Sequence, residues 1–242
     1  MLLGWQDIKQ RYRRSMLGPL WLTISTAVMV IALGYVYAAI FRQSLNDYFP
    51  YLAAGLVIWS FISGTIVDGC QTFIASEGII KQIRVPFFAH VMRVIWRNMI
   101  VLGHNAIIIV VVVVLFASAQ DPFVLLMFIP GLALVVLSAA WVTLLIGMIC
   151  ARFRDVPQII ANVLQLMFFL TPIIWQPGVL PGRQRVIYWN PLYHFVEVIR
   201  APLLGKMPAA ETWLAVIGVT ALGWLLTLYF FTQFRRRIAY WL

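Results

Sequence analysis

Charged residues and cysteines are scarce in this sequence. Asp, Glu, Lys and Arg make up 11% of the 242 residues, whereas soluble globular domains carry about 25%. The mean hydropathy is high, at +0.92. Cys70 and Cys150 lie in apolar runs without CxxC or histidine-flanked spacing, so they are predicted to be packing residues rather than metal ligands or a disulfide. These shortages exclude a soluble domain and indicate an integral membrane protein.

The motifs of familiar enzyme classes are also missing. The sequence contains no GxxxxGK[ST], GxGxxG, HExxH or GxSxG pattern, so neither ATP hydrolysis nor common hydrolase chemistry is predicted. We therefore expect no enzyme activity, no catalytic residue, no metal site and no cofactor in this chain. Energy for any transport would come from a partner or from an ion gradient.

Ion coupling needs ionisable groups at membrane depth, and these are few. Asp68 and His104 lie at similar depths in one predicted helical hairpin, so they are able to pair. A structural pair, a position on a water-filled cavity and a proton relay are the three interpretations. The relay has the least support, because no second acidic residue is available to pass the proton on.

Six apolar runs are long enough to cross a bilayer, for which a helix needs about 20 residues. They cover approximately residues 19–41, 51–75, 98–117, 123–151, 158–175 and 212–234. We therefore predict an all-α integral membrane fold with six transmembrane helices in a single domain over residues 1–242.

The basic residues are distributed unevenly between the two sides of the predicted bundle. The N-terminal segment, the second and fourth connections and the C-terminal tail hold most of the 18 Lys and Arg residues. Cytoplasmic loops collect such residues. The net charge of +10 is therefore attributed to membrane topology rather than to nucleic acid, and both termini are predicted to be cytoplasmic.

Residues 2–16 are predicted to form a helix that lies in the cytoplasmic interface. Trp5, Ile8 and Tyr12 recur at helical spacing, with polar and basic residues between them. Gly18 and Pro19 end the pattern. The alternative is a basic leader that only sets the topology.

The second connection is predicted to contain a short helix at about residues 77–85, parallel to the membrane. Ser76 is expected to cap it and Pro86 to end it. Glu77, Lys81 and Arg84 would then face the cytoplasm. The helix is interpreted as a docking element, and the alternative is an ordinary solvated loop helix.

The segment at about 177–205 is apolar but interrupted by five prolines. The pair Asn190 and Pro191 splits it into two half-helices that enter from the outer face. Broken backbone at membrane depth persists only where protein or a water-filled cavity satisfies it. Glu197 and Arg200 are expected to pair at i, i+3, so that loss of Arg200 would strand a carboxylate; the alternative is that both residues face water.

The sequence resembles the permease subunits of type 2 ATP-binding cassette exporters, in the branch that carries polysaccharides and polyol phosphates such as O-antigen, capsule and teichoic acid. The resemblance covers essentially the whole chain. It is carried by "RYRRSMLGPLW" at 11–21, "RFRD" at 152–155, "NPLYHFVEVIRAPLLG" at 190–205 and the closing "RRRIAYWL".

This resemblance implies an N-terminal interfacial helix, a coupling helix between spans two and three, and re-entrant helices before span six. Two copies of the permease would pair with two ATPase subunits, which use ATP and Mg. The dimer would enclose a channel for a lipid-linked glycan. An O-antigen on undecaprenyl diphosphate is the first choice of substrate, and capsule and teichoic acid remain open. An ion-coupled secondary transporter and a lipid-modifying enzyme are the alternatives from other classes.

The site residues that follow from this resemblance fall into four groups. The ATPase-coupling group is Glu77, Ile79, Ile80, Lys81 and Arg84. The outer gate is Asn190, Pro191, Tyr193, His194, Glu197 and Arg200. The entrance for the lipid diphosphate is Lys9, Arg11, Arg13 and Arg14. The channel lining is Tyr35, Tyr37, Trp59, Phe168, Phe169 and Trp175, for which packing or interface anchoring is the alternative.

Overall fold

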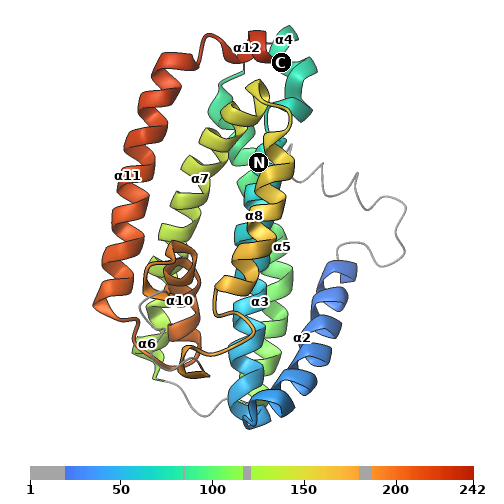
Figure 1. Cartoon of the computed structure of the whole chain (residues 1–242), viewed down its shortest axis with the longest axis vertical. Helices are drawn as coiled ribbons and strands as arrows, with labels where there is room; N and C mark the ends of the chain where they lie inside the picture. Colours follow the sequence, from blue (N-terminus) through green and yellow to red (C-terminus); the bar gives the residue numbers. More distant parts are fainter. Residues whose placement is uncertain (1–19, 84, 117–120, 180–186) are drawn as a thin grey trace.

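The computed structural model describes residues 20–83, 85–116, 121–179 and 187–242, and within these ranges the chain is helical without strands. Helices long and apolar enough to cross a membrane are α2 (Leu20–Phe41), α3 (Leu45–Cys70), α5 (Phe87–Phe116), the run Pro122–Arg152 and α11 (Ala210–Phe234). The apolar helix α8 (Val156–Leu170) is shorter. The predicted all-α membrane fold is confirmed, with five helices of spanning length and one shorter apolar helix in place of the predicted sixth span (Figure 1).

Shorter elements lie at the ends of the bundle. The 3-10 turn η1 (Ile74–Ser76) leads into α4 (Glu77–Gln82), and α12 (Ile238–Trp241) follows α11. The run Pro122–Arg152 consists of α6 (Pro122–Leu126) and α7 (Phe128–Arg152). The turn η2 (Pro177–Val179) and α10 (Pro191–Leu203) lie between α8 and α11.

The helices pack around α3. It contacts α2, α5, α7, α8 and α10, and it is far more buried than the other four spans. The short helix α10 packs among α3, α7 and α11. α4, α12 and the turn from α7 to α8 lie at one end of the bundle, called here the α4 end, and α10 lies in the opposite half (Figure 1).

Three predicted boundaries of spans two and three are wrong. Span two begins at Leu45 rather than 51, since Ser44 caps the helix by accepting a hydrogen bond from the Asp47 amide at 3.2 Å. It also ends at Cys70 rather than 75. Span three begins at Phe87 rather than 98. Arg93 and Arg97 therefore belong to α5 and not to a loop.

Two further boundaries are set by proline. Span four is interrupted at Met127, because Pro130 has no amide to bond the carbonyl four residues earlier. Span five is helical only to Leu170 instead of 175, because Thr171 precedes Pro172 and adopts an extended conformation (ψ 133°). With its 15 residues, α8 is about 22 Å long, whereas the hydrocarbon core measures about 30 Å.

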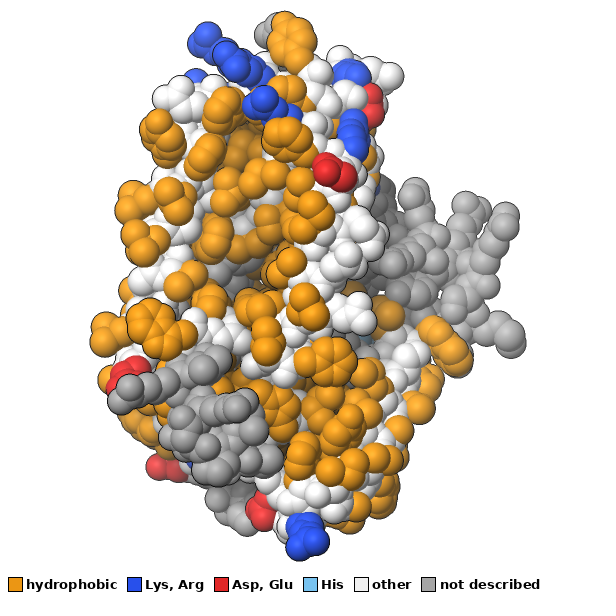
Figure 2. Space-filling view, in the orientation of Figure 1, with side chains coloured by type: hydrophobic (Ala, Val, Ile, Leu, Met, Phe, Trp, Pro, Cys, Tyr) orange, Lys and Arg blue, Asp and Glu red, His pale blue; other side chains and the backbone are white. Residues whose placement is uncertain are grey.

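The surface agrees with a lipid environment. Hydrophobic side chains cover most of the flank in Figure 2, and Lys and Arg gather mainly at the α4 end. Buried hydrophobic residues form a large cluster around α3 and a smaller one near the α4 end. The smaller cluster includes Phe73 and Ile238, so it joins α12 to the rest of the bundle.

Candidate functional site

The backbone immediately after α8 is buried but not helical. Residues 171–174 are all buried, and they follow a bent path between α8 and η2. Buried backbone groups outside a helix must find other hydrogen-bond partners. The segment 171–175 is therefore the point at which side chains from elsewhere have to satisfy the buried backbone.

Those partners come from the first turns of α3 and from α10. The Tyr48 hydroxyl donates to the Ile174 carbonyl at 2.6 Å. The Tyr51 hydroxyl lies 2.8 Å from the Pro172 carbonyl and 3.0 Å from the Trp175 carbonyl. Arg200 Nη1 donates to the Pro172 carbonyl at 2.7 Å. We call residues 171–175 together with Tyr48, Tyr51 and Arg200 the junction.

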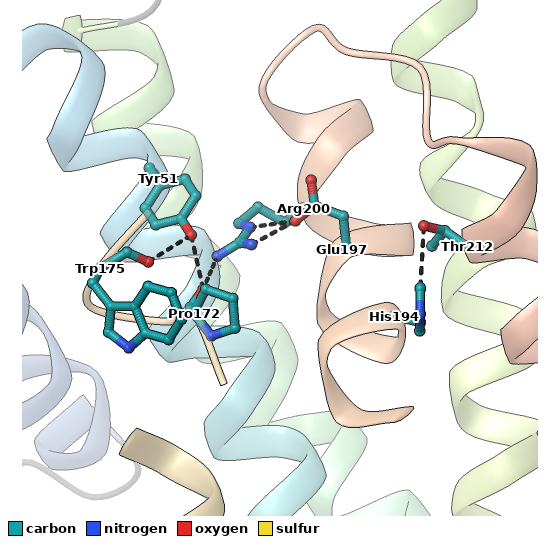
Figure 3. A network of polar contacts seen from close by, with 7 residues as sticks. All are labelled: Tyr51, Pro172, Trp175, His194, Glu197, Arg200 and Thr212. Atoms are coloured by element: carbon teal, nitrogen blue, oxygen red, sulfur yellow. Dashed lines mark hydrogen bonds and ion pairs between the residues drawn. The ribbon is translucent and has the colours of Figure 1, made fainter. Parts of the chain in front are cut away.

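Arg200 is the charged centre of the junction (Figure 3). Its Nε donates to Glu197 Oε2 at 2.9 Å, and its guanidinium carbon lies 4.0 Å from the centroid of the Tyr51 ring. Guanidinium groups stack on aromatic faces and stay charged, so this position suits arginine better than lysine. The predicted pairing of Glu197 with Arg200 is confirmed.

The start of α10 is fixed by Asn190. Its Oδ1 accepts the Leu192 amide at 3.0 Å and its Nδ2 donates to Thr171 Oγ1 at 2.9 Å. Pro191 occupies the first helical turn, where its missing amide is not needed. Asn190 therefore ends the preceding segment, caps α10 and holds α10 to the end of α8.

The predicted outer-gate residues do not all meet at one point. His194 points away from Arg200: its Nε2 donates to the Tyr188 carbonyl at 2.8 Å, and its Nδ1 lies 3.3 Å from Thr212 Oγ1 (Figure 3). Tyr193 is buried against the rings of Tyr188 and His194. One side of α10 thus contacts the junction, and another contacts α11. Their gate role stays a prediction.

The aromatic residues predicted to line the channel lie in different environments. Trp59 is only 7% exposed and packs against Phe168 in the core, which is a packing position. Tyr35 and Phe169 are exposed. Tyr37 is half-buried against Phe41, and the half-buried Trp175 donates its Nε1 hydrogen to the Phe169 carbonyl at 3.0 Å. The lining role of the exposed residues stays a prediction.

The polar groups inside the bundle pair differently from the prediction. Asp68 Oδ2 lies 2.8 Å from Arg97 Nη2 and accepts the Asn98 Nδ2 hydrogen at 2.9 Å. His104 Nδ1 instead donates to the Ile100 carbonyl at 2.8 Å. The proposed Asp68–His104 pair is therefore wrong. The reason is the early start of α5, which brings Arg97 onto the helix face beside Asp68.

α4 presents one exposed and one inward isoleucine at its end of the bundle. Ile79 is exposed, whereas Ile80 packs against the smaller core cluster. Lys81 Nζ lies 2.7 Å from Glu77 Oε1, and this hydrogen bond lowers the pKa of the Glu77 carboxyl. The predicted side-chain cap by Ser76 is wrong, because η1 continues directly into α4 and the Glu77 amide bonds the Ile74 carbonyl.

Residues 1–204 match the model of the ABC-2 type transporter family. The chain belongs to this family. It is 24% identical over 192 residues to the O-antigen export system permease protein RfbA of Klebsiella pneumoniae, covering 77% of this chain and 73% of that protein. It is 23% identical over 221 residues to RfbA of Myxococcus xanthus, covering 89% and 84%. A second Klebsiella pneumoniae RfbA is 22% identical over 228 residues, covering 92% and 85%.

The family match confirms the resemblance stated from the sequence motifs. Together with the apolar helices, it shows that this ABC-2 type transporter is a multi-pass membrane protein. Some of its predicted features fall outside the described residues: the interfacial helix at 2–16, the first part of the re-entrant segment at 180–186, and Lys9, Arg11, Arg13, Arg14 and Arg84. Tyr48, Tyr51 and Pro172 were missed as site residues. The Thr171–Pro172 pair signals the helix end, but the tyrosine contacts have no local sequence signal.

Proposed function

We propose that this chain is the channel-forming permease subunit of an ATP-driven exporter that moves a lipid-linked polysaccharide across the cytoplasmic membrane. An O-antigen on undecaprenyl diphosphate is the proposed substrate, with capsule or teichoic acid polymers as the alternatives. The family match and three relatives that carry the name of O-antigen export permeases support this proposal. Those matches extend over most of each relative's length.

The observation that carries the proposal is the junction. Irregular backbone at membrane depth is costly unless protein or water satisfies it, and here Tyr48, Tyr51 and Arg200 bond the carbonyls of Pro172, Ile174 and Trp175. We infer that the junction and α10 form the gate at the outer mouth, which opens when Arg200 and the Pro172 carbonyl separate.

The energy for this movement is proposed to come from a separate ATPase. Two copies of the permease would enclose the passage, and two ATP-binding cassette subunits, which bind ATP and Mg, would dock on α4 through Ile79. The α4 end would then be cytoplasmic, with both termini on that side. Lys9, Arg11, Arg13 and Arg14 are proposed to attract the diphosphate of the lipid carrier to the entrance.

Deletion of the gene in its native host tests the function. We expect loss of the polysaccharide from the cell surface and accumulation of lipid-linked polymer inside the cell. The wild-type chain supplied on a plasmid should restore export only when the partner ATPase has an intact ATP site. Persistence of the surface polymer in the deletion strain would contradict the proposed function.

A further inference from the structure

The C-terminal helix α12 is built into the α4 end. Ile238 is fully buried in the smaller core cluster together with Phe73, and Ile80 and Leu242 pack against the same cluster. α12 also contacts α4 directly, and the two helices lie side by side in Figure 1. A movement of α4 relative to α12 would therefore break a shared apolar core.

The turn from α7 to α8 ties into the same unit. The Arg152 guanidinium carbon lies 5.4 Å from the centroid of a Trp241 ring and 5.1 Å from that of Phe153. Arg154 Nη2 donates to the Leu242 carbonyl at 3.3 Å. We name residues 77–83, 152–155 and 235–242 the platform. Its three segments are remote in sequence but connected by direct contacts.

The outer surface of the platform combines exposed apolar groups with excess positive charge. Ile79, Ile83, Phe153 and Tyr240 are exposed, and Tyr240 is 89% exposed. Five arginines are also exposed: Arg152, Arg154, Arg235, Arg236 and Arg237. The acidic groups among the described platform residues are Glu77, which is paired with Lys81, and Asp155. Exposed aromatic side chains surrounded by arginines are typical of protein interfaces.

We propose that the ATP-binding cassette subunit docks on the whole platform, with α12 as a second contact beside α4, through an acidic surface that surrounds an apolar centre. This inference rests on the proposed function, because it assumes that an ATPase subunit binds α4. The new part of the inference is that the C-terminal segment holds α4 in position. This segment also contributes Tyr240, Arg235, Arg236 and Arg237 to the interface.

The orientation of α12 favours a protein partner over a lipid surface. A helix that binds the membrane interface keeps its apolar face for lipid. In α12, Ile238 faces the protein core, so the exposed side carries Tyr240, and Arg235, Arg236 and Arg237 lie exposed just before it. Binding of these arginines to anionic lipid is the outcome that the experiment must separate from docking.

The test uses the full-length permease co-expressed with its cognate ATP-binding cassette subunit. Tyr240→Ala and the triple change R235E/R236E/R237E should each weaken association of the ATPase about tenfold, as expected for loss of an anchor residue or of complementary charge. Ile79→Asp should release it as well. Lys206→Glu, which changes an exposed cation outside the platform, is the control and should bind normally. Association is measured by co-purification per membrane-inserted permease.

The outcomes separate the two proposals. If Ile79→Asp releases the ATPase while Tyr240→Ala and the triple variant bind it normally, docking on α4 stands and the platform is overturned. If Ile79→Asp also binds normally, the proposed docking site itself fails. The triple variant could instead keep its association with the ATPase and lose only membrane insertion or binding to anionic lipid vesicles. In that case the arginines serve lipid, and the platform is again overturned.

Discussion

Arg200 and Glu197 form an ion pair whose two members are buried to different degrees. The Arg200 side chain is 1% exposed and that of Glu197 is 23% exposed. Loss of Arg200 therefore leaves a carboxylate that is partly exposed, whereas loss of the Glu197 charge leaves a guanidinium that is fully buried. The sequence suggested a stranded carboxylate, but the structure assigns the greater burial to the cation. Breaking a buried pair costs most when the remaining charge is the buried one.

A double-mutant cycle on this pair should show strong coupling. Glu197→Gln and Arg200→Met should each lower the thermal stability of the solubilised permease. The double variant should lose less stability than the sum of the two, by about 1–3 kcal/mol, because it leaves neither charge behind. Thermal unfolding in detergent measures this difference, and surface polysaccharide reports the effect on export. Additive losses would show that the pair is effectively solvated.

At the scale of elements, the sequence predicted helices well where apolarity alone defines them. α2 and α11 begin and end within about two residues of expectation, and the break before α10 lies at Asn190 as predicted. The start of α5 was missed because Arg93 and Arg97 resemble loop residues. The contacts that build the junction could not be predicted, since Tyr48 and Tyr51 lie 126 and 121 residues from their carbonyl partners.

The approach of α10 to α7 depends on a glycine. A Cβ added at Gly131 would lie 2.8 Å from the Val198 carbonyl oxygen, which is a backbone atom of α10. Gly131→Ala should therefore displace α10, destabilise the permease by about 1–3 kcal/mol and reduce export severalfold. Thermal unfolding and surface polysaccharide, measured at equal membrane levels, check this expectation.

Gly218→Ala is the matched control for this change. Gly218 lies within a helix and would place its new Cβ in open space. Alanine is favoured over glycine inside helices by about 1 kcal/mol, so the control should be at least as stable as the wild type and equally active. Equal behaviour of Gly131→Ala and Gly218→Ala would show that α10 does not need this close approach.

For the whole molecule, the proposed passage must be formed by residues that a single chain leaves uncovered. Tyr35 and Phe169 meet this condition and Trp59 does not. The two native cysteines, Cys70 and Cys150, are buried. Tyr35 and Phe169 can therefore be tested by cysteine labelling, with Trp59 as the buried control.

Cysteine labelling should distinguish a water-filled lining from a lipid-facing surface. In a chain with Cys70→Ala and Cys150→Ala, we expect Tyr35→Cys and Phe169→Cys to react with a membrane-impermeant thiol reagent while the exporter is active. Trp59→Cys should not react, because that position is packed in the core. Absence of labelling at both exposed positions would place them against lipid and remove them from the passage.

The burial of Arg200 also constrains the order in which the protein is made. An arginine at the centre of a bilayer costs about 2.5–3.5 kcal/mol during insertion by the translocon, so α10 is a poor candidate for independent entry into lipid. Its partners on α3 and after α8 are synthesised earlier in the chain. We therefore expect α10 to join a site that α3 and the segment after α8 have already formed, so that this half of the bundle assembles from the N-terminal side.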